Sequence, residues 1–304
     1  MNGSPLRGPV GLLAAEIGAG AQITGCRAGP RALLPGVHDT LREEGVACRS
    51  YGIVSSREKA GADKLAIVNE FLPRLAAAVR RMLADDAFPL VLGGDHSCAA
   101  GTWSAIAEAV RARGTPGLIW IDAHLDSHTP QTSASQAPHG MPLAALLGEG
   151  DAGMSALYGW RGKVRPQHVA VIGARSHEAE ETARLQRLGV RVFAQREVAR
   201  RGFARCLAEA RTLAGAAPAG YGVSFDLDVI DPRDAPGVGS PAEDGLRPAE
   251  AVEALAALAD DRALLGLELV EYNPALDVAG RTARLAEALL SAALAGRREA
   301  VEAA

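Results

Sequence analysis

The stretch that decides the fold is GLIWIDAHLD, residues 117–126. Its first half, Gly117–Ile121, is apolar throughout, which is typical of a parallel strand buried on both faces of an α/β sheet. Its second half places Asp122, His124 and Asp126 directly after that strand. Ligand sites of such sheets lie beyond the carboxyl ends of the strands, and buried charges need compensation. The stretch therefore predicts an α/β fold with a charged site at one edge of its sheet.

Apolar strands alternate with helices along the rest of the chain. Further strands are expected at Val10–Ile17, Ala47–Val54, Pro89–Leu92, Val169–Gly173, Val190–Phe193, Gly220–Phe225 and Leu264–Val270. Helices are expected from Gly29, at Lys64–Leu83 with a kink or restart at Pro73, and at Ala99–Arg113, Pro142–Leu147, Glu178–Leu188, Phe203–Ala214, Pro248–Leu258 and Arg281–Leu294. This alternation predicts a mainly parallel sheet with helices on both faces. No domain boundary is visible, so we expect one domain over residues 1–304.

Composition excludes several classes of protein. With 304 residues and 48% hydrophobic residues, the chain can bury a large core. A net charge of −4 gives no basic surface for nucleic acid. No apolar run reaches the roughly 18 residues that span a bilayer, and the N-terminus lacks the apolar core of an export signal. The four cysteines show no zinc spacing, which indicates reduced thiols in a cytoplasmic protein.

Four polar clusters each follow an expected strand. They contain His96, the group from Asp122 to Asp126, the pair Asp226 and Asp228, and Glu271. The carboxyl ends of parallel strands share one edge of the sheet, so these clusters are expected to converge there. In extended backbone, polar residues that alternate with apolar ones point to the same side. Both Asp-containing clusters show this alternation, which indicates that their side chains face a common point.

The charge of these clusters predicts a metal site. Four convergent aspartates carry four negative charges, and without cations several of them would have to be protonated. Two divalent cations neutralise that charge. Oxygen and nitrogen ligands without a thiolate favour Mn²⁺ over a structural zinc. Two such ions, roughly 3.5–4 Å apart, can hold a water molecule as hydroxide at neutral pH.

Each motif also has an ordinary structural explanation when it is taken alone. An Asp-x-Asp after a strand is usually a turn or a helix cap. The pair Gly93-Gly94 is most often a tight turn, and a single His96 is more often a hydrogen-bonded structural residue than a ligand. The structural explanation requires this coincidence at four separate strand ends, so we favour a binuclear metal site.

On these motifs the chain resembles the arginase/ureohydrolase family. The motifs are GGDHS at residues 93–97, DAHLD at residues 122–126 and SFDLDVIDP at residues 224–232. The resemblance implies a three-layer α/β/α sandwich around a parallel sheet of about eight strands. It implies one Mn²⁺ held by His96, Asp122, Asp126 and Asp226, and a second held by His124, Asp122, Asp226 and Asp228. Co²⁺, Ni²⁺ or Fe²⁺ suit the same ligands.

The reaction implied by the resemblance is hydrolysis of a guanidino group to urea and an amine by a metal-bridging hydroxide. Glu271 matches the residue that binds the guanidinium, and a carboxylate can pair with that cation in bidentate fashion. His139 matches the histidine that protonates the leaving amine, for which an imidazole is suited. Asp126 completes the implied catalytic set. Asp231 is expected to hold its loop or to support a metal ligand.

The loop between the metal motif and His139 resembles the arginase loop that recognises the amino-acid end of L-arginine. Ser133 and Ser135 occupy matching positions, and Glu178 stands where arginases often carry an aspartate for the α-amino group. His128 departs from the family, because arginases usually have an asparagine there that contacts the α-carboxylate. Gln136 and Ala137 replace a common Gly-Asn pair. Loss of such a polar partner costs about 1–3 kcal/mol, unless a protonated His128 compensates.

The expected function is therefore hydrolysis of L-arginine to L-ornithine and urea. Two alternatives stay open: hydrolysis of another guanidino compound, such as agmatine or a guanidino acid, and a metal-binding homologue without turnover. Zinc-dependent deacetylases share the fold but use one metal, so two ions per chain would distinguish them. The expected partner is a small guanidino substrate, and the resemblance implies a homo-oligomer, either a trimer or a hexamer.

Overall fold

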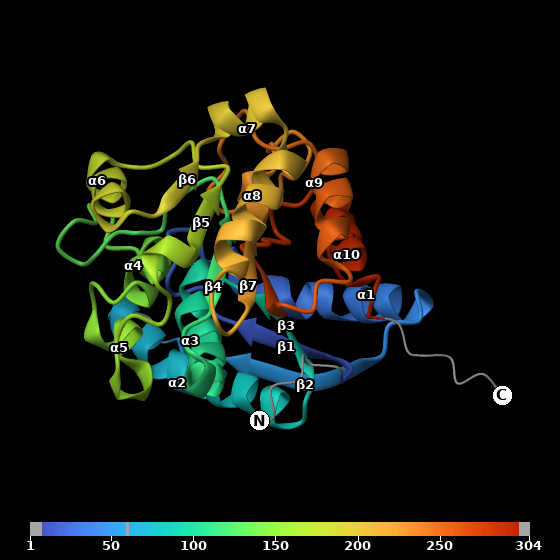
Figure 1. Cartoon of the computed structure of the whole chain (residues 1–304), viewed down its shortest axis with the longest axis horizontal. Helices are drawn as coiled ribbons and strands as arrows, with labels where there is room; N and C mark the ends of the chain where they lie inside the picture. Colours follow the sequence, from blue (N-terminus) through green and yellow to red (C-terminus); the bar gives the residue numbers. More distant parts are fainter. Residues whose placement is uncertain (1–7, 59–60, 298–304) are drawn as a thin grey trace.

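The computed structural model, which describes residues 8–58 and 61–297, contains an eight-stranded sheet with parallel strand pairings (Figure 1). The strand order is β2-β1-β3-β8-β7-β4-β5-β6. The strands are β1 (Val10–Glu16), β2 (Cys48–Ser55), β3 (Phe88–Gly93), β4 (Gly117–Ile121), β5 (Val169–Ile172), β6 (Arg191–Phe193), β7 (Tyr221–Asp226) and β8 (Leu264–Val270). The predicted α/β class and the parallel sheet of about eight strands are confirmed.

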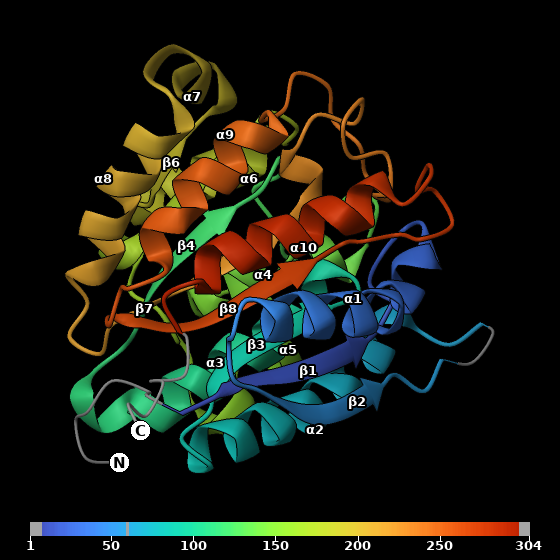
Figure 2. The ribbon, with the colours of Figure 1, turned by 90° about the vertical axis from the view of Figure 1, so that its right-hand side faces the viewer.

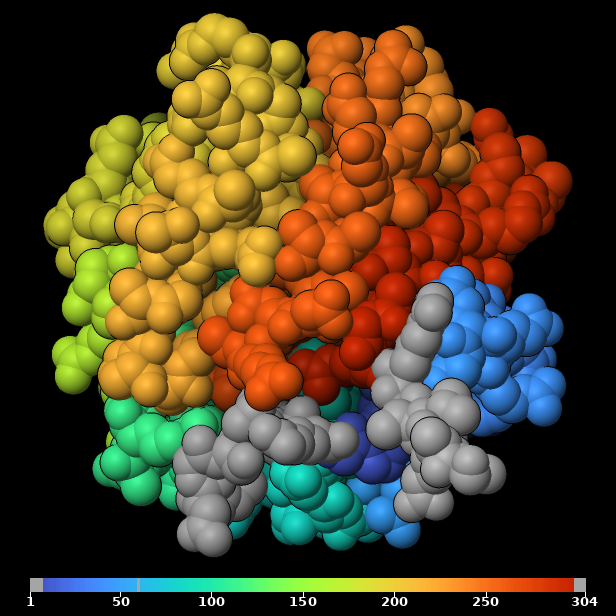
Figure 3. Space-filling view, turned by 45° about the vertical axis from the view of Figure 1, so that its right-hand side comes forward, coloured from blue at the N-terminus to red at the C-terminus, as the bar shows by residue number. Residues whose placement is uncertain are grey.

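Helices cover both faces of the sheet and complete three layers (Figure 2). The helices on one face, in order across it, are α1 (Gly29–Glu43), α10 (Arg281–Leu294), α9 (Pro248–Leu255) and α8 (Phe203–Gly215). The space-filling view shows this face, with colours from the yellow of α8 through orange and red to the blue of α1 (Figure 3). The other face carries α2 (Lys64–Ala84), α3 (Ala99–Val110), α4 (Pro142–Leu146) and α5 (Ala152–Ser155).

Alternate strand residues contribute to two separate apolar cores. In β4, Ile119 and Ile121 pack into the core under α8, α9 and α10. Leu118 and Trp120 belong to the core under α2 and α3. Because successive strand side chains point to opposite faces, β4 needs apolar residues at every position. This requirement explains the continuous apolar run in the sequence.

The order of the strands determines where the site lies. The four strands that precede the polar clusters, β3, β8, β7 and β4, are immediate neighbours in the middle of the sheet. β3 and β4 are successive strands in the chain, but β8 and β7 lie between them in the sheet, so the connections bring the carboxyl ends of all four strands together. The predicted convergence of the clusters at one edge of the sheet follows from this order.

Some local predictions were incomplete or wrong. The predicted restart at Pro73 is wrong, because α2 continues through this residue. The buried side chains of Phe71, Leu72 and Leu75 hold that part of the helix against the core, which outweighs the backbone hydrogen bond that a proline removes. The sequence pattern also missed α5 and α7 (Gln195–Arg201), which are short and bury few residues.

The described residues bear on the expectations about membrane spans and cysteines. Across residues 8–58 and 61–297, the helices lack the combination of length and apolar character that crossing a bilayer requires. All four cysteines are free thiols. The first seven residues, on which the expectation about an export signal partly rests, lie outside the described residues. The single domain over residues 1–304 also stays a prediction.

Gly222 in β7 provides the space in which the Trp103 indole of α3 packs on the sheet. A Cβ atom at Gly222 would lie 1.8 Å from Cζ3 of Trp103. We therefore expect Gly222→Ala to lower the free energy of unfolding by about 1–3 kcal/mol through overpacking, measured by urea denaturation. Gly215→Ala, at the end of α8, is the control, since a Cβ there meets its nearest neighbour at 3.9 Å. Equal stabilities of the two variants would contradict this account.

Candidate metal centre

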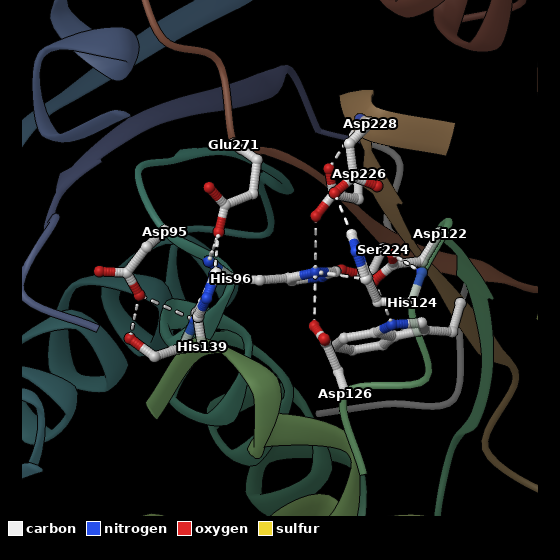
Figure 4. A network of polar contacts seen from close by, with 12 residues as sticks. Asp95, His96, Asp122, His124, Asp126, His139, Ser224, Asp226, Asp228 and Glu271 are labelled. Atoms are coloured by element: carbon white, nitrogen blue, oxygen red, sulfur yellow. Dashed lines mark hydrogen bonds and ion pairs between the residues drawn. The ribbon is translucent and has the colours of Figure 1, made fainter. Parts of the chain in front are cut away.

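The six predicted metal ligands lie together at the carboxyl edge of the central strands (Figure 4). His96 follows β3 in a 3-10 turn, η2 (His96–Cys98), whose preceding residue Asp95 caps it by accepting a hydrogen bond from the Ser97 amide. Asp122 directly follows β4, and Asp226 is the last residue of β7. The backbone and side chains of the sheet therefore position the cluster.

The prediction of extended backbone within the two Asp-containing motifs is wrong beyond the strand ends. β4 ends at Ile121, and Asp126 has a positive φ of 44°. Asp228 lies in a 3-10 turn, η7 (Leu227–Val229). The carboxylates themselves form these turns. Asp122 Oδ1 accepts a hydrogen bond from the amide of His124 at 2.6 Å, and Asp226 Oδ1 accepts one from the amide of Asp228 at 2.8 Å.

The second oxygens of these carboxylates surround one nitrogen of His96. Its Nδ1 lies 3.2 Å from Asp122 Oδ2, 3.0 Å from Asp126 Oδ2 and 3.1 Å from Asp226 Oδ2. Despite these short distances, the buried Nδ1 meets the geometry of a hydrogen bond with none of the described residues. Nδ1 of His96 thus faces three carboxylates but forms a hydrogen bond with none of them.

A second group of ligands adjoins the first. His124 Nδ1 lies 3.0 Å from Asp228 Oδ2 and 3.5 Å from Asp122 Oδ1. Asp122 therefore contributes one oxygen to each group. Two sets of these residues are spaced closely enough to hold a metal ion: His96 with Asp122 and Asp226, and His124 with Asp122 and Asp228.

Without cations, only protons can balance the charges of this cluster. Burial, followed by the charges of Asp228 and Asp122, raises the pKa of Asp226 well above its usual range. Burial alone would lower the pKa of His96, but its contacts with three carboxylates raise it well above its usual value. The pKa of His124 is also raised, because the effect of nearby Asp228 and Asp122 outweighs that of burial. The metal-free cluster thus holds protons where cations would otherwise bind.

The geometry of the cluster fits a pair of divalent cations. Ligands about 2.1 Å from one cation lie about 3.0 Å apart when they are neighbours in an octahedron. The distances from His96 Nδ1 to the three carboxylate oxygens have this value. The donors are carboxylate oxygens and imidazole nitrogens, which suit Mn²⁺ and similar ions.

Glu271 and His139 lie beside the metal ligands. Glu271 Oε1 is 3.0 Å from His139 Nδ1 and accepts a hydrogen bond from the His96 amide at 2.8 Å. Its other oxygen, Oε2, is buried and has no hydrogen-bond partner among the described residues. Burial alone would lower the pKa of His139, but the contact with Glu271 raises it to about 9. The pair therefore offers a protonated imidazole and a carboxylate oxygen that lacks a donor.

Two residues of the site have strained backbone conformations. Asp126 and Glu271 have positive φ values of 44° and 66°, which are unfavourable for residues other than glycine by about 1–3 kcal/mol. Such conformations persist where the surrounding structure enforces them, and they occur often at functional sites. Here they turn both carboxylates toward the shared edge.

A pocket of about 330 Å³ opens above the cluster. Its lining includes the metal-ligand candidates His124, Asp126, Asp226 and Asp228, together with His128, Ser135, His139 and Glu178. The predicted substrate residue Ser133 does not line it. The Ser133 Oγ lies behind the wall, 3.4 Å from that of Ser135. The pocket therefore connects the metal cluster with most of the loop expected to recognise the substrate.

The outer wall of the pocket carries a histidine paired with two glutamates. His128 Nε2 lies 2.5 Å from Glu178 Oε2 and 3.4 Å from Glu181 Oε2. Burial is the main cause that raises the pKa of Glu181 to about 7. The described residues that line the pocket include no lysine or arginine. Glu181 was not predicted from the sequence. A glutamate three residues after Glu178 is also typical of a helix start, where the two residues cap the helix, so no separate sign of its role was visible in the sequence.

Two further aspartates near the site hold its loops. Asp231 holds its own loop, because it accepts hydrogen bonds from the Arg233 guanidinium and from the Gly245 amide. Asp95 received no role from the sequence, yet its Oδ2 accepts a hydrogen bond from the Gly20 amide at 2.8 Å. It therefore ties the glycine-rich loop after β1 to the residues around His96.

Comparison with known proteins agrees with this geometry. A family model described as "Arginase family" matches residues 9–296. The chain is 41% identical to the arginase of Bacillus caldovelox over 226 residues, which cover 74% of this chain and 75% of that protein. It is 33% identical to the arginase of Agrobacterium fabrum, with 94% and 90% covered. The crystal structure of arginase from Bacillus subtilis matches with a TM-score of 0.88 and 33% identity, covering 94% of this chain and 98% of that one. The chain belongs to the arginase family.

Proposed function

We propose that this protein hydrolyses the guanidino group of L-arginine to give L-ornithine and urea. Its membership of the arginase family supports this activity. The observation that carries the proposal is the arrangement of one pocket, whose lining includes four of the six metal-ligand candidates together with His139. Glu271 lies behind His139, 3.0 Å from its Nδ1. The same pocket is lined by His128, Ser135 and Glu178, which are expected to recognise the rest of the substrate.

We propose that the cluster binds two Mn²⁺ ions. One ion would be held by His96, Asp122, Asp126 and Asp226, and the other by His124, Asp122, Asp226 and Asp228. Co²⁺, Ni²⁺ and Fe²⁺ suit the same ligands. When bound, such ions lower the pKa of water and so supply a hydroxide nucleophile at neutral pH.

The protein's own residues orient the substrate and move a proton. Glu271 Oε2 is a buried acceptor without a donor, and a guanidinium supplies donors together with a compensating charge. Glu271 would thus hold the substrate's guanidinium above the cluster. His139, whose pKa of about 9 keeps it protonated at neutral pH, would give its proton to the leaving amine. Asp126 would contribute to both metal binding and catalysis.

The outer wall would recognise the tail of the substrate through Ser135, Glu178 and His128. Ser133, whose Oγ lies 3.4 Å from that of Ser135, would support Ser135 from behind the wall. Glu178 and Glu181 suit an ammonium group. Among the described residues, His128 is the histidine that contacts both glutamates, and its Nε2 is already paired with Glu178. A carboxylate on the tail would have to compete for it.

This pairing makes agmatine the second candidate substrate. Agmatine carries the same amine as arginine and lacks the carboxylate, so it would leave the contact between His128 and Glu178 intact. A guanidino acid would place its carboxylate close to two glutamates without a lysine or arginine in the described lining. The contact therefore favours agmatine over a guanidino acid as the alternative.

The homo-oligomer, trimeric or hexameric, and the cytoplasmic location stay predictions. Size-exclusion chromatography with light scattering tests the first of them, and localisation of a tagged chain tests the second.

Substrate preference tests the proposed activity. With Mn²⁺ added, we expect urea release with a higher kcat/KM for L-arginine than for agmatine or 4-guanidinobutyrate. The reason is that arginine alone offers both the ammonium for Glu178 and a second group for the serine-containing loop. A higher kcat/KM for agmatine would show that agmatine, and not L-arginine, is the preferred substrate. Absence of urea from all three compounds, with two ions bound per chain, would support a homologue without turnover.

Proton release tests the metal assignment. The raised pKa values of His96 and His124 keep both imidazoles protonated at pH 7 in the metal-free protein. Since a metal binds only the neutral imidazole, we expect Mn²⁺ binding to release at least two protons, one from each of these imidazoles. Titration calorimetry in buffers of different ionisation enthalpy measures this number. The variant His38→Asn, outside the site, should give the same number, whereas binding without net proton release would contradict the assignment.

Replacement of His128 tests the recognition of the tail. We expect His128→Asn to raise the ratio of kcat/KM for L-arginine to that for agmatine by about tenfold, because the amide can donate to a carboxylate. The change also frees Glu178 for the ammonium. His38→Asn should leave the ratio unaltered. An unchanged or lower ratio in His128→Asn would exclude this role for His128.

A further inference from the structure

Three buried side chains form a row directly beneath the metal cluster. Trp120 in β4 is the register partner of Ser224 in β7, and Ser224 is the register partner of Glu268 in β8. All three are fully buried. Asp122, just past the end of β4, and Asp226, the last residue of β7, each lie two residues beyond a member of this row. Their side chains therefore point to the same face of the sheet as the row does.

Glu268 is an acid in the middle of the sheet with neutral donors around it. Its Oε2 accepts hydrogen bonds from Trp103 Nε1 at 3.1 Å and from Ser224 Oγ at 2.8 Å. Its Oε1 faces the thiol of Cys98 at 3.7 Å. A buried polar group is destabilising unless hydrogen bonds satisfy it, and an apolar residue would pack in this place without that requirement. Packing alone therefore does not explain why an acid stands at position 268.

Ser224 connects this acid to His96. The Ser224 Oγ lies 3.0 Å from His96 Nε2 (Figure 4). A serine hydroxyl has a single hydrogen, and Ser224 donates it to Glu268. Its oxygen must then accept from His96, so the proton of the neutral imidazole resides on Nε2. Nδ1, which faces the three carboxylates, keeps its lone pair.

Trp120 fixes the plane of the same imidazole. Its ring stacks on that of His96 with centroids 4.0 Å apart and planes 8° apart. Its Nε1 also donates to Asp122 Oδ2 at 2.8 Å. The ring position of His96 thus depends on Trp120, while its tautomer depends on Ser224 and Glu268.

We propose that Glu268 is a positioning residue which, by orienting the hydroxyl of Ser224, fixes His96 in the tautomer that binds metal through Nδ1. This inference rests on the proposed role of His96 as a metal ligand. Without the acceptor at Glu268, the Ser224 hydroxyl can turn and donate to Nε2, which would place a proton on Nδ1 and oppose the cation. Partners of this kind behind a ligating histidine typically change metal affinity 10–100-fold.

Metal affinity of matched variants tests the inference without reference to catalysis. We expect Ser224→Ala and Glu268→Met to weaken the binding of one of the two Mn²⁺ ions by about 10–100-fold. Glu268→Gln retains an acceptor oxygen for Ser224 and should bind close to the unaltered protein. Titration of metal-free protein, followed by the electron paramagnetic resonance of free Mn²⁺, measures both affinities.

Trp103→Phe separates the proposed effect from a general loss of packing. It removes the other donor to Glu268 Oε2 and lowers stability, but it leaves the contact between Ser224 and His96 in place. We expect a lower melting temperature of its metal-free form and unaltered Mn²⁺ affinities. The inference is overturned if Ser224→Ala binds both ions normally, if Glu268→Gln loses as much affinity as Glu268→Met, or if Trp103→Phe loses as much as either.

A further variant distinguishes failure of the inference from failure of the metal assignment. His96→Ala should lose one ion. If it retains both with normal affinity, His96 is not a ligand and the assignment itself fails. If His96→Ala loses an ion while Ser224→Ala does not, the assignment holds and only the role of Glu268 is wrong.

Discussion

The concentration of negative charge at one buried edge of the sheet is the constraint on which this structure depends. Asp122, Asp226 and Asp228 are almost completely buried and within reach of two imidazoles. Such a group is unfavourable unless positive charge balances it. In the protein alone, protons on His96 and His124 provide part of that balance. Divalent cations provide it more completely, and the spacing of the ligands already matches their coordination.

The same carboxylates also shape the backbone that carries them. Asp122 and Asp226 each use one oxygen to accept an amide hydrogen bond that forms a turn, and the other oxygen faces His96. The turns bring His124 and Asp228 back toward the cluster. Beneath them, Trp120 and Ser224 hold the ring of His96 from the next row of the sheet. The site is therefore built into the central strands rather than placed on a mobile loop.

The charged groups of the outer wall are arranged differently from those at the base of the pocket. At the base, several carboxylates and an imidazole surround a common point where a cation could bind. At the wall, His128 and Glu178 contact one another directly, so recognition of a substrate tail requires this contact to be kept or exchanged. Under the proposed function, this contact would influence which guanidino compound is preferred, and the residues at the base would carry the reaction.

The sequence by itself determined the fold class and predicted which polar residues gather at one edge of the sheet. The apolar run before Asp122 indicated a strand buried on both faces, and polar residues after four such strands indicated a common edge. The resemblance also led to the expectation that Asp231 holds its loop or supports a metal ligand, and the structure shows that it holds its loop. These features depend on local periodicity and on the position of residues along a strand, which one sequence contains.

Only the tertiary structure decided how these residues meet. In the order β3-β8-β7-β4, β3 lies beside β8 and β4 beside β7, although the members of each pair are distant in the chain. The contact between Ser224 and Glu268 exists only because β7 and β8 pair in one register. The positive φ of Asp126, the contact of His128 with Glu178 and the part played by Glu181 could not be predicted either. Each depends on distances between side chains from separate segments, and periodicity carries no information about those distances.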